Sequence, residues 1–361
     1  MQHVLITGGA GFIGSNFVRY LLGIEPDIQV FNLDALTYAG SLENLRELPN
    51  PQRHTFMTGD ICDRSLVEDL IHQNQIDTIV HFAAETHVDR SIVYPEPFVR
   101  TNVLGTWTLL EVARQVWINE KSMPLNKIHF HHISTDEVFG SLAPEGPAFS
   151  ENTPYAPNSP YAATKAASDH LVRVYSHTYG LPVTITNCSN NYGPYQFPEK
   201  LIPLMILNAV GGKPLPVYGD GRQVRDWLFV EDHCEAIWHV IRHGSPGETY
   251  NIGGNNQLTN LSVVEMICDV LDEFLPNSPH IPHKSLIQFV ADRPGHDRRY
   301  AMDMTKVQRE LGWQPRQSLE SGLLKTVEWY LSHPDWVEAI RKQSDIQRWM
   351  KQNYEQRGGP V

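Results

Sequence analysis

The chain has 361 residues, of which 41% are hydrophobic, and a formal net charge of −12 at pH 7. Because the excess charge is acidic and no basic block is present, we expect neither nucleic acid nor an anionic membrane surface as a partner. No segment reaches the roughly 18–20 apolar residues of a membrane span. The first residues enter a strand without the cationic and apolar regions of a signal peptide, so we expect a cytoplasmic protein.

Cysteine and histidine predict neither disulfides nor a metal site. The cysteines at positions 62, 188, 234 and 268 are widely spaced and form no C-x-x-C pair. This usage is typical of free thiols in a reducing compartment. The histidines at 129, 131 and 132 lie in or near one strand and lack the ligand spacing of a zinc site. We therefore predict no metal.

The first half of the chain alternates short apolar runs with helical patterns. Strands are predicted over residues 3–7, 29–34, 78–84, 127–134 and 183–187, with a late strand over 249–254. Helical segments separate them, notably over 101–118 and 161–179. Continuous apolar runs are typical of parallel strands that are covered on both faces. The alternation predicts an α/β fold with a Rossmann-type, doubly wound parallel sheet.

After about residue 188 the composition changes. Loops rich in proline, glycine and aromatic residues follow, and such loops commonly shape a pocket. Amphipathic helices are predicted over 262–275 and 320–333. We expect residues 1–187, with a returning segment at about 225–255, to form the Rossmann domain. Residues 188–361 are expected to form mainly a smaller α/β lobe that binds the substrate.

A glycine-rich loop, TGGAGFIG, joins the first strand to the first helix, with glycines at positions 8, 11 and 14. Glycine permits a tight turn and the close approach of a pyrophosphate, which the helix N-terminus stabilises. Asp34 follows twenty residues after Gly14, at the end of the second strand. A carboxylate there accepts a hydrogen bond from a ribose 2′-hydroxyl and repels a 2′-phosphate. The pattern therefore predicts NAD rather than NADP.

Two further motifs indicate redox and proton-transfer chemistry. Tyr161 and Lys165 form Y-x-x-x-K and share one face of a predicted helix. The ammonium can lower the tyrosine pKa, so that the phenolate takes a proton from a sugar hydroxyl during hydride transfer. Thr135 lies upstream at a strand end and is followed by two acids, Asp136 and Glu137. Adjacent carboxyls repel each other and are costly to bury, so this pair predicts a functional site.

The motifs that surround these residues carry a resemblance to a known family. They are TGGAGFIGSN, DALTYAGSLENL, AAETHVDRSI, HHISTDEVFG, SPYAATKAASDHLV, TNCSNNYGPYQFPEKLIP, YGDGRQVRDWLFVEDH, YNIGG and DRPGHDRRYAMD, between residue 7 and about 303. The chain resembles the extended short-chain dehydrogenase/reductases and, within them, the dTDP-glucose 4,6-dehydratase family. STDEV is the specific element, since epimerases of the superfamily usually lack the acid pair. Thr86 and Phe139 replace a frequent Ser and Tyr, which leaves the expected activity unchanged.

The resemblance implies a hydro-lyase of deoxysugar (rhamnose-type) biosynthesis. It would convert dTDP-glucose to dTDP-4-keto-6-deoxyglucose and water, with NAD bound tightly and regenerated. Oxidation at C4 makes the C5 hydrogen acidic; Glu137 would then abstract it while Asp136 protonates the departing C6 hydroxyl. Neighbouring carboxyls in a pocket of low dielectric constant tend to separate their pKa values, as an acid and a base require.

The resemblance also implies binding residues. Beside the glycines, Asp34, Tyr161 and Lys165, those expected to contact NAD are Phe12, Ile13, Ala35, Leu36, Thr37, Asp60, Ile61, Phe82, Ala83, Ala84, Thr86, Thr101 and Asn191. Those expected to contact the nucleotide sugar are Thr86, Thr135, Asn190, Lys200, Leu201, Pro216, Val217, Tyr218, Arg225, Asn260, Asp292, Arg293, Pro294, Gly295 and His296. Arg225 and Arg293 would hold the diphosphate, because a guanidinium makes bidentate, charge-assisted contacts. His87, Asp89 and Arg90 would not contact the ligands themselves but would orient the residues that do.

Several alternatives stay open at this stage. An NAD-dependent sugar-nucleotide epimerase or decarboxylase of the same fold would not need the acid pair. A non-catalytic NAD-binding module would be expected to lose the tyrosine, the lysine or an acid, and all are present. The sequence leaves thymidine, uridine and other nucleoside diphosphates undecided. In the family, the helices that correspond to 101–118 and 161–179 pair two subunits, so we expect a homodimer.

Overall fold

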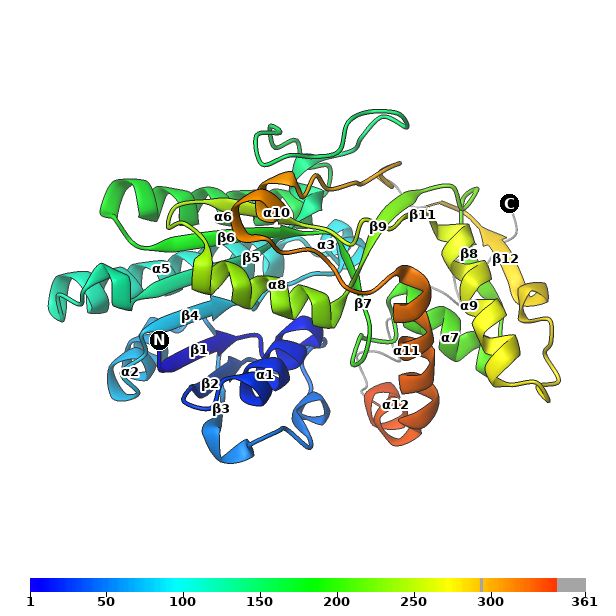
Figure 1. Ribbon diagram of the computed structural model, residues 1–361, viewed down its shortest axis with the longest axis horizontal. Helices are drawn as coiled ribbons and strands as arrows, with labels where there is room; N and C mark the ends of the chain where they lie inside the picture. Colours follow the sequence, from blue (N-terminus) through cyan, green and yellow to red (C-terminus); the bar gives the residue numbers. More distant parts are fainter. Residues whose placement is uncertain (293–294, 343–361) are drawn as a thin grey trace.

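The computed structural model describes residues 1–292 and 295–342. Its largest element is a seven-stranded sheet with the order β10-β6-β5-β4-β1-β2-β3, in which every pair of neighbours is parallel (Figure 1). The strands are β1 (His3–Thr7), β2 (Gln29–Asp34), β3 (His54–Thr58), β4 (Thr78–His81), β5 (His129–Thr135), β6 (Val183–Cys188) and β10 (Thr249–Ile252). The predicted doubly wound parallel sheet is confirmed.

Helices cover both faces of this sheet because its strands are apolar on both sides. In β1, Val4 and Ile6 point to the face covered by α1 (Phe12–Ile24) and α8 (Val230–His243). Leu5, between them, packs on the opposite face. The helices of that face are α2 (Arg64–Gln73), α5 (Thr106–Ala113) and α6 (Pro160–Tyr179). All three β1 side chains are fully buried, which is the reason for the continuous apolar run.

Some elements differ from the sequence-based expectation. The segment expected as one helix over 101–118 is a π–α–π stretch, formed by η3 (Val99–Gly105), α5 and η4 (Arg114–Glu120). Strand β4 ends at His81, so that residues 82–84 leave the sheet. The sequence analysis missed β3, because this edge strand is half exposed and its HTFMT sequence carries no apolar run.

The smaller C-terminal lobe is built on two short sheets. One has the order β11-β9-β7 and the other pairs β12 with β8. Their strands are β7 (Asn190–Tyr192), β8 (Leu215–Tyr218), β9 (Val224–Phe229), β11 (Gln257–Thr259) and β12 (Ile287–Val290). The lobe's helices are α7 (Leu201–Val210), α9 (Asn260–Phe274), α11 (Leu319–Ser332) and α12 (Pro334–Arg341), whereas α10 (Thr305–Leu311) packs against β10 and α8 of the large sheet. A buried core joins the sheets to α7, α9, α11 and α12.

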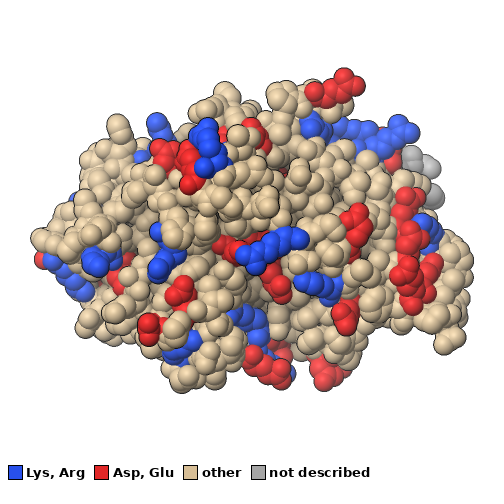
Figure 2. Space-filling view, viewed as in Figure 1, with Lys and Arg blue, Asp and Glu red and all other residues tan. Residues whose placement is uncertain are grey.

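The remaining helical segments are short and lie in connections. They are η1 (Leu42–Leu45), η2 (Pro51–Arg53), α3 (Val88–Val93), α4 (Glu96–Phe98), η5 (Leu125–Lys127), η6 (Asp136–Phe139) and η7 (His283–Leu286). Acidic and basic side chains are interspersed on the face shown in Figure 2. Within residues 1–292 and 295–342, no helix combines the length and the hydrophobicity that crossing a membrane requires.

Candidate active site

A cleft of about 340 Å³ lies at the carboxyl ends of the strands of the large sheet. Strand order reverses between β1 and β4, and in open α/β sheets ligands bind in the crevice at such a point. Every residue predicted to contact the cofactor lines this cleft except Leu36. Leu36 has a φ of 52°, and its N–H donates to Asp34 Oδ1 at 2.8 Å, so its backbone shapes the loop that holds the aspartate.

The glycine loop leaves no room for side chains. A Cβ at Gly14 would lie 2.2 Å from the carbonyl oxygen of Gly8, and one at Gly8 would lie 2.6 Å from the backbone nitrogen of Ala83. Gly8 also has a φ of 74°, which favours glycine. Helix α1 begins after Gly11 without a side-chain cap, so its first N–H groups face the cleft unshielded. This arrangement fits a dinucleotide pyrophosphate.

Asp34 is held at the end of β2 by two backbone donors. Ala10 N–H donates to Oδ2 at 2.9 Å and Leu36 N–H to Oδ1 at 2.8 Å. Burial raises the pKa of this carboxyl, and the two hydrogen bonds oppose that shift. Each oxygen keeps a lone pair, so the side chain can still accept a hydrogen bond from a ribose hydroxyl.

The acid pair lies where β5 ends and η6 begins. Thr135 caps η6: its Oγ1 accepts from Glu137 N–H at 3.3 Å and donates to Asp136 Oδ1 at 3.2 Å. Asp136 is 2% exposed, whereas Glu137 is half-buried, and both line the cleft. Burial and then the negative charge of Glu137 raise the pKa of Asp136 well above its ordinary value. The protonated form of Asp136 is therefore favoured relative to that of an ordinary aspartate.

The other oxygen of Asp136, Oδ2, is buried and has no hydrogen-bond partner among the described residues. A buried polar atom without a partner is costly, and this one belongs to a side chain that lines the cleft. The geometry therefore provides a buried carboxyl group with a raised pKa and a free oxygen, next to a more exposed second carboxyl. Such a pair is suited to proton donation by one group and proton abstraction by the other.

Tyr161 and Lys165 project from the first two turns of α6, which Ser159 caps through a 3.1 Å hydrogen bond to Ala162 N–H. Lys165 Nζ donates to the carbonyl oxygen of Ile133 at 2.7 Å. Burial lowers the pKa of Lys165 to about 8. Burial, followed by the negative charge of Glu137, raises the pKa of Tyr161 well above its ordinary value, while a hydrogen bond with Thr135 opposes the shift. This direction is opposite to the one expected from the Y-x-x-x-K pair: burial is the largest cause, and the ammonium of Lys165 donates to the β5 backbone.

Known proteins resemble this chain over nearly its whole length. The model of the GDP-mannose 4,6 dehydratase family matches residues 5–326. The dTDP-glucose 4,6-dehydratase of Salmonella typhimurium is 54% identical over 98% of this chain and 99% of its own. That of Xanthomonas campestris pv. campestris (strain B100) is 56% identical over 93% of this chain and 95% of its own. This chain belongs to the dTDP-glucose 4,6-dehydratase family.

Solved structures agree with this membership. The dTDP-glucose 4,6-dehydratase of Bacillus anthracis in complex with NAD is 46% identical, with a TM-score of 0.83 over 94% of this chain and 100% of that one. The Streptomyces venezuelae dehydratase with NAD bound is also 46% identical, with a TM-score of 0.84 over 94% and 100%. A UDP-glucose 4-epimerase of Thermotoga maritima shares the fold at 28% identity, with a TM-score of 0.79 over 92% and 99%.

The residues predicted to contact the nucleotide sugar divide into two groups in this family member. Four line the cleft, namely Thr86, Thr135, Asn190 and Lys200. The others described do not line it, namely Leu201, Pro216, Val217, Tyr218, Arg225, Asn260, Asp292, Gly295 and His296. Arg293 and Pro294 lie outside the described residues.

Several members of the second group nevertheless lie together. Strand β8 carries Tyr218, whose ring centroid is 6.3 Å from that of His296. His296 Nδ1 lies 2.6 Å from Asp292 Oδ1, and Gln223 donates to Asp292 Oδ2 at 2.9 Å. Arg225 is buried: it donates to the carbonyl oxygen of Asp297 at 3.0 Å and stacks over another ring, that of Tyr300.

A polar cluster formed by Tyr38, Glu85 and Glu199 also lines the cleft, and none of the three is among the predicted site residues. The Arg90 guanidinium lies 3.9 Å from the ring centroid of Tyr38 and pairs with Glu199 Oε2 at 3.3 Å. His87 Nε2 lies 3.5 Å from the other oxygen of Glu199. Burial raises the pKa of both Glu85 and Glu199. The THVDRS motif pointed to His87 and Arg90, but no local pattern marked their glutamate partner.

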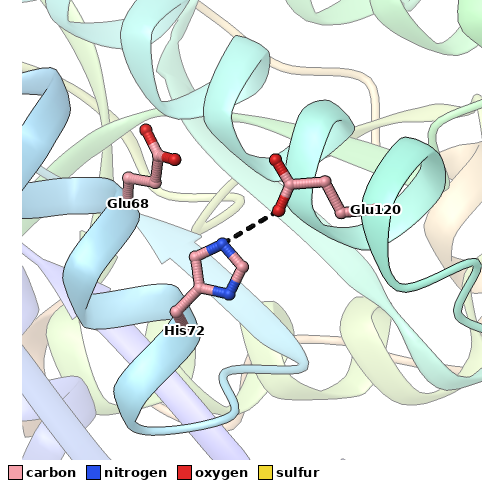
Figure 3. Close-up of side chains that lie close together, drawn as sticks. All are labelled: Glu68, His72 and Glu120. Carbon is pink, nitrogen blue, oxygen red and sulfur yellow. Dashed lines mark ion pairs between the residues drawn. The ribbon is translucent and has the colours of Figure 1, made fainter.

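One group of potential metal ligands occurs within the described ranges, formed by Glu68 and His72 of α2 and Glu120 of η4 (Figure 3). The ligand atoms lie within 4.8 Å of one another, and His72 Nε2 is 3.0 Å from Glu120 Oε2. None of the three lines the cleft. The contact between His72 and Glu120 is a partly exposed ion pair between two surface helices, and it takes no part in the chemistry of the cleft.

Proposed function

We propose that this chain converts dTDP-glucose to dTDP-4-keto-6-deoxyglucose and water, with NAD as a bound cofactor that is regenerated in each turnover. The observation that carries the proposal is the acid pair after Thr135, in which Asp136 is buried with a raised pKa and Glu137 is more exposed. The pair shares one cleft with the glycine loop and with Tyr161. Relatives of this chain at 54% and 56% identity carry the name of this activity.

The residues present fit NAD. The glycine loop and the N-terminus of α1 would hold the pyrophosphate, Asp34 the adenosine ribose, and Tyr161 and Lys165 the nicotinamide half. When bound, NAD would supply hydride-transfer chemistry, accepting a hydride from C4 of the sugar and, in its reduced form, delivering that hydride to C6. Tyr161 accepts the proton of the C4 hydroxyl, and Thr135, which hydrogen-bonds to Tyr161, orients that hydroxyl.

The elimination needs a base and an acid. Once C4 is a carbonyl carbon, the C5–H bond is acidified and the Glu137 carboxylate takes that proton. The electron pair forms the C5–C6 double bond, and the C6 hydroxyl leaves as water after Asp136 gives it a proton. The proton on Glu137 exchanges with solvent, and Glu137 then delivers a solvent-derived proton to C5 when C6 is reduced. The raised pKa of Asp136 supports its part, because an ionised carboxylate could not donate.

We also propose the finer assignments of the substrate lobe and of the assembly. Residues 1–187 with the returning segment 225–255 would form the NAD-binding domain, and the rest mainly the nucleotide-sugar lobe. Asn190, Lys200 and Leu201 would contact the sugar, Pro216–Tyr218 the base, and Arg225 with Arg293 the diphosphate, completed by Asn260 and residues 292–296. These assignments would account for the Tyr218–His296–Asp292 contacts in that lobe.

A homodimer in the cytoplasm completes the proposal. Large apolar side chains are exposed on the helices expected to pair, with Leu104 at 43%, Trp107 at 38%, Val174 at 46% and Tyr179 at 47% exposure. Exposed apolar side chains concentrated on two neighbouring helices favour a covering partner. Sedimentation equilibrium should give twice the chain mass, and Trp107→Glu should give monomers.

The test of the activity is a comparison of nucleotide sugars. Purified protein with NAD is incubated in parallel with dTDP-glucose, UDP-glucose and GDP-mannose, and the 4-keto-6-deoxy product is followed by its absorbance in alkali. In ²H₂O the product should carry deuterium at C5. We expect turnover with dTDP-glucose. Interconversion of dTDP-glucose and dTDP-galactose without loss of water would instead identify an epimerase and contradict the proposal.

A further inference from the structure

A buried carboxylate lies one helical turn beyond Lys165. Asp169 follows Lys165 by four residues on α6, so the two side chains share one face of the helix. Asp169 is 2% exposed and does not line the cleft. Charged residues are almost never fully buried without partners, so Asp169 is expected to interact with neighbouring polar or charged groups.

Three hydrogen bonds tie Asp169 to the strand ends that carry the acid pair. Its Oδ2 accepts from Ser134 Oγ at 2.7 Å, from Tyr155 OH at 2.9 Å and from Asn187 Nδ2 at 3.5 Å. Asn187 Nδ2 also donates to the carbonyl oxygen of Thr135 at 3.2 Å. The network therefore joins α6 to the end of β5, immediately before Asp136.

The other oxygen of Asp169 faces the lysine side of the site. Asp169 Oδ1 lies 3.2 Å from His132 Nε2, and the same nitrogen is 3.3 Å from Lys165 Nζ. Burial lowers the pKa of His132 well below its ordinary value, so the imidazole is neutral and supplies no countercharge. The titratable groups around Lys165 are Asp169 on α6, His132 on β5, His81 on β4 and Cys188 on β6.

Among these groups, Asp169 is the one that favours the charged lysine most. Burial lowers the pKa of Lys165 to about 8, and the negative charge of Asp169 is the largest influence in the opposite direction. Burial lowers the pKa of His81 well below its ordinary value, as it does that of His132, so both imidazoles are neutral. A thiol with a pKa raised to about 12, as at Cys188, is neutral as well.

We propose that Asp169 is a positioning residue of the dehydratase reaction, which holds the Lys165 ammonium in its charged form and fastens α6 to the acid-bearing end of β5. The inference rests on the proposed function, because it concerns the lysine of that site. Asp169 touches neither the cleft nor a reacting atom. It acts through Lys165, Ser134 and Asn187.

The pH profile of Asp169→Asn tests the electrostatic part. Without the negative charge, the pKa of Lys165 falls below about 8, so the protonated lysine is lost at lower pH. The alkaline limb of kcat should move to lower pH by roughly one to three units, the usual effect of one close countercharge. At pH 8 the loss of kcat should be about fivefold or more, and it should become smaller towards pH 6.

Two matched variants separate charge from packing. Asp169→Glu keeps the charge, so its alkaline limb should stay in place even if kcat falls. Tyr155→Phe removes one hydrogen bond to Asp169 and leaves the charge, so its limb should not move either. Asp169→Ser is a second neutral variant, used in the same way if the Asn variant does not fold.

A second readout requires no turnover. A lysine whose folded pKa lies below its unfolded value of about 10.4 makes the protein more stable as the pH rises through that window. Between pH 6 and pH 10, the thermal midpoint of Asp169→Asn should therefore rise by more than that of Asp169→Glu. A neutral variant whose alkaline limb and midpoint profile both match the wild type would overturn the inference. Failure of the wild type to form the 4-keto-6-deoxy product would count against the proposed function, while the midpoint profiles would still decide the role of Asp169.

Discussion

The cofactor half of the site and the substrate lobe differ in how the fold assembles them. In the cofactor half, each functional segment directly follows a strand of one parallel sheet: Gly8 follows β1, Phe82 follows β4, and Asp136 follows β5. Thr7 is in register with Leu33 and with His81, so these segments begin at one level. In the substrate lobe, the predicted residues lie on two small sheets and a loop, and most do not line the cleft.

The difference shows what parallel topology contributes. The carboxyl ends of parallel strands meet at one edge, so a residue that ends a strand is brought to the site by register alone. In the lobe, a residue reaches the substrate only through the placement of several separate elements. Arg225 illustrates this, because it lies on β9 and is held by backbone carbonyl groups and the ring of Tyr300.

The largest effect is expected in the cofactor half, from Tyr161→Phe. Without the phenolic oxygen no group accepts the C4 hydroxyl proton, so the first oxidation should slow by roughly 10²–10⁴. The rate of nicotinamide reduction in a single turnover measures it. Tyr94→Phe, at a tyrosine that is 65% exposed, is the matched control and should behave as wild type. An unchanged rate in Tyr161→Phe would mean that the base lies elsewhere.

Glu137→Gln should separate the two chemical steps. Oxidation at C4 does not need Glu137, so reduced nicotinamide should form and persist, while product formation falls roughly 10²-fold or more. Absorbance of the reduced cofactor and deuterium at C5 are the measurements, and the exposed Glu145→Gln is the control. Normal turnover, or loss of nicotinamide reduction in a folded variant that still binds substrate, would show that the acid pair positions the sugar rather than transferring protons.

Arg225→Lys tests whether the substrate lobe reaches the diphosphate. Lysine keeps the positive charge that opposes the pKa shift of Asp136. It lacks the planar guanidinium group, which can contact two phosphate oxygens at once. We expect KM for dTDP-glucose to rise roughly tenfold, which corresponds to about 1.4 kcal/mol, with a much smaller change in kcat. The exposed Arg222→Lys serves as the control. If KM stays constant, Arg225 is structural and the lobe holds the diphosphate by other groups.

The smallest effect concerns stability and follows from the buried acid. The folded-state pKa of Asp136 is raised, so the unfolded chain loses its proton first and stability falls as the pH rises above about 4. Asp136→Asn removes this penalty. Its thermal midpoint at pH 7 should exceed that of the wild type by on the order of 2 °C. The difference should vanish near pH 4, and a lower midpoint at pH 7 would contradict the raised pKa.

The sequence by itself determined the features that local patterns encode. Alternating apolar and helical segments indicated the parallel sheet, and the glycine loop, Asp34 and the Y-x-x-x-K pair marked the cofactor half. The edge strand β3 was not predicted from the sequence, because a half-exposed strand needs no apolar run. The acid pair was found because two adjacent carboxyls after a buried strand are physically costly.

Only the tertiary structure decided how these groups differ from one another. Asp136 and Glu137 are neighbours in sequence, yet burial raises the pKa of the first well above its ordinary value. Trp336 of α12 donates to Asn44 at 2.9 Å, and Asn44 donates to the Ala10 carbonyl at 2.8 Å, so the far end of the described chain supports the cofactor loop. Local patterns identify residue types and their backbone setting. Desolvation and charge at one atom sum over segments far apart in the chain, and only the folded arrangement brings those segments together.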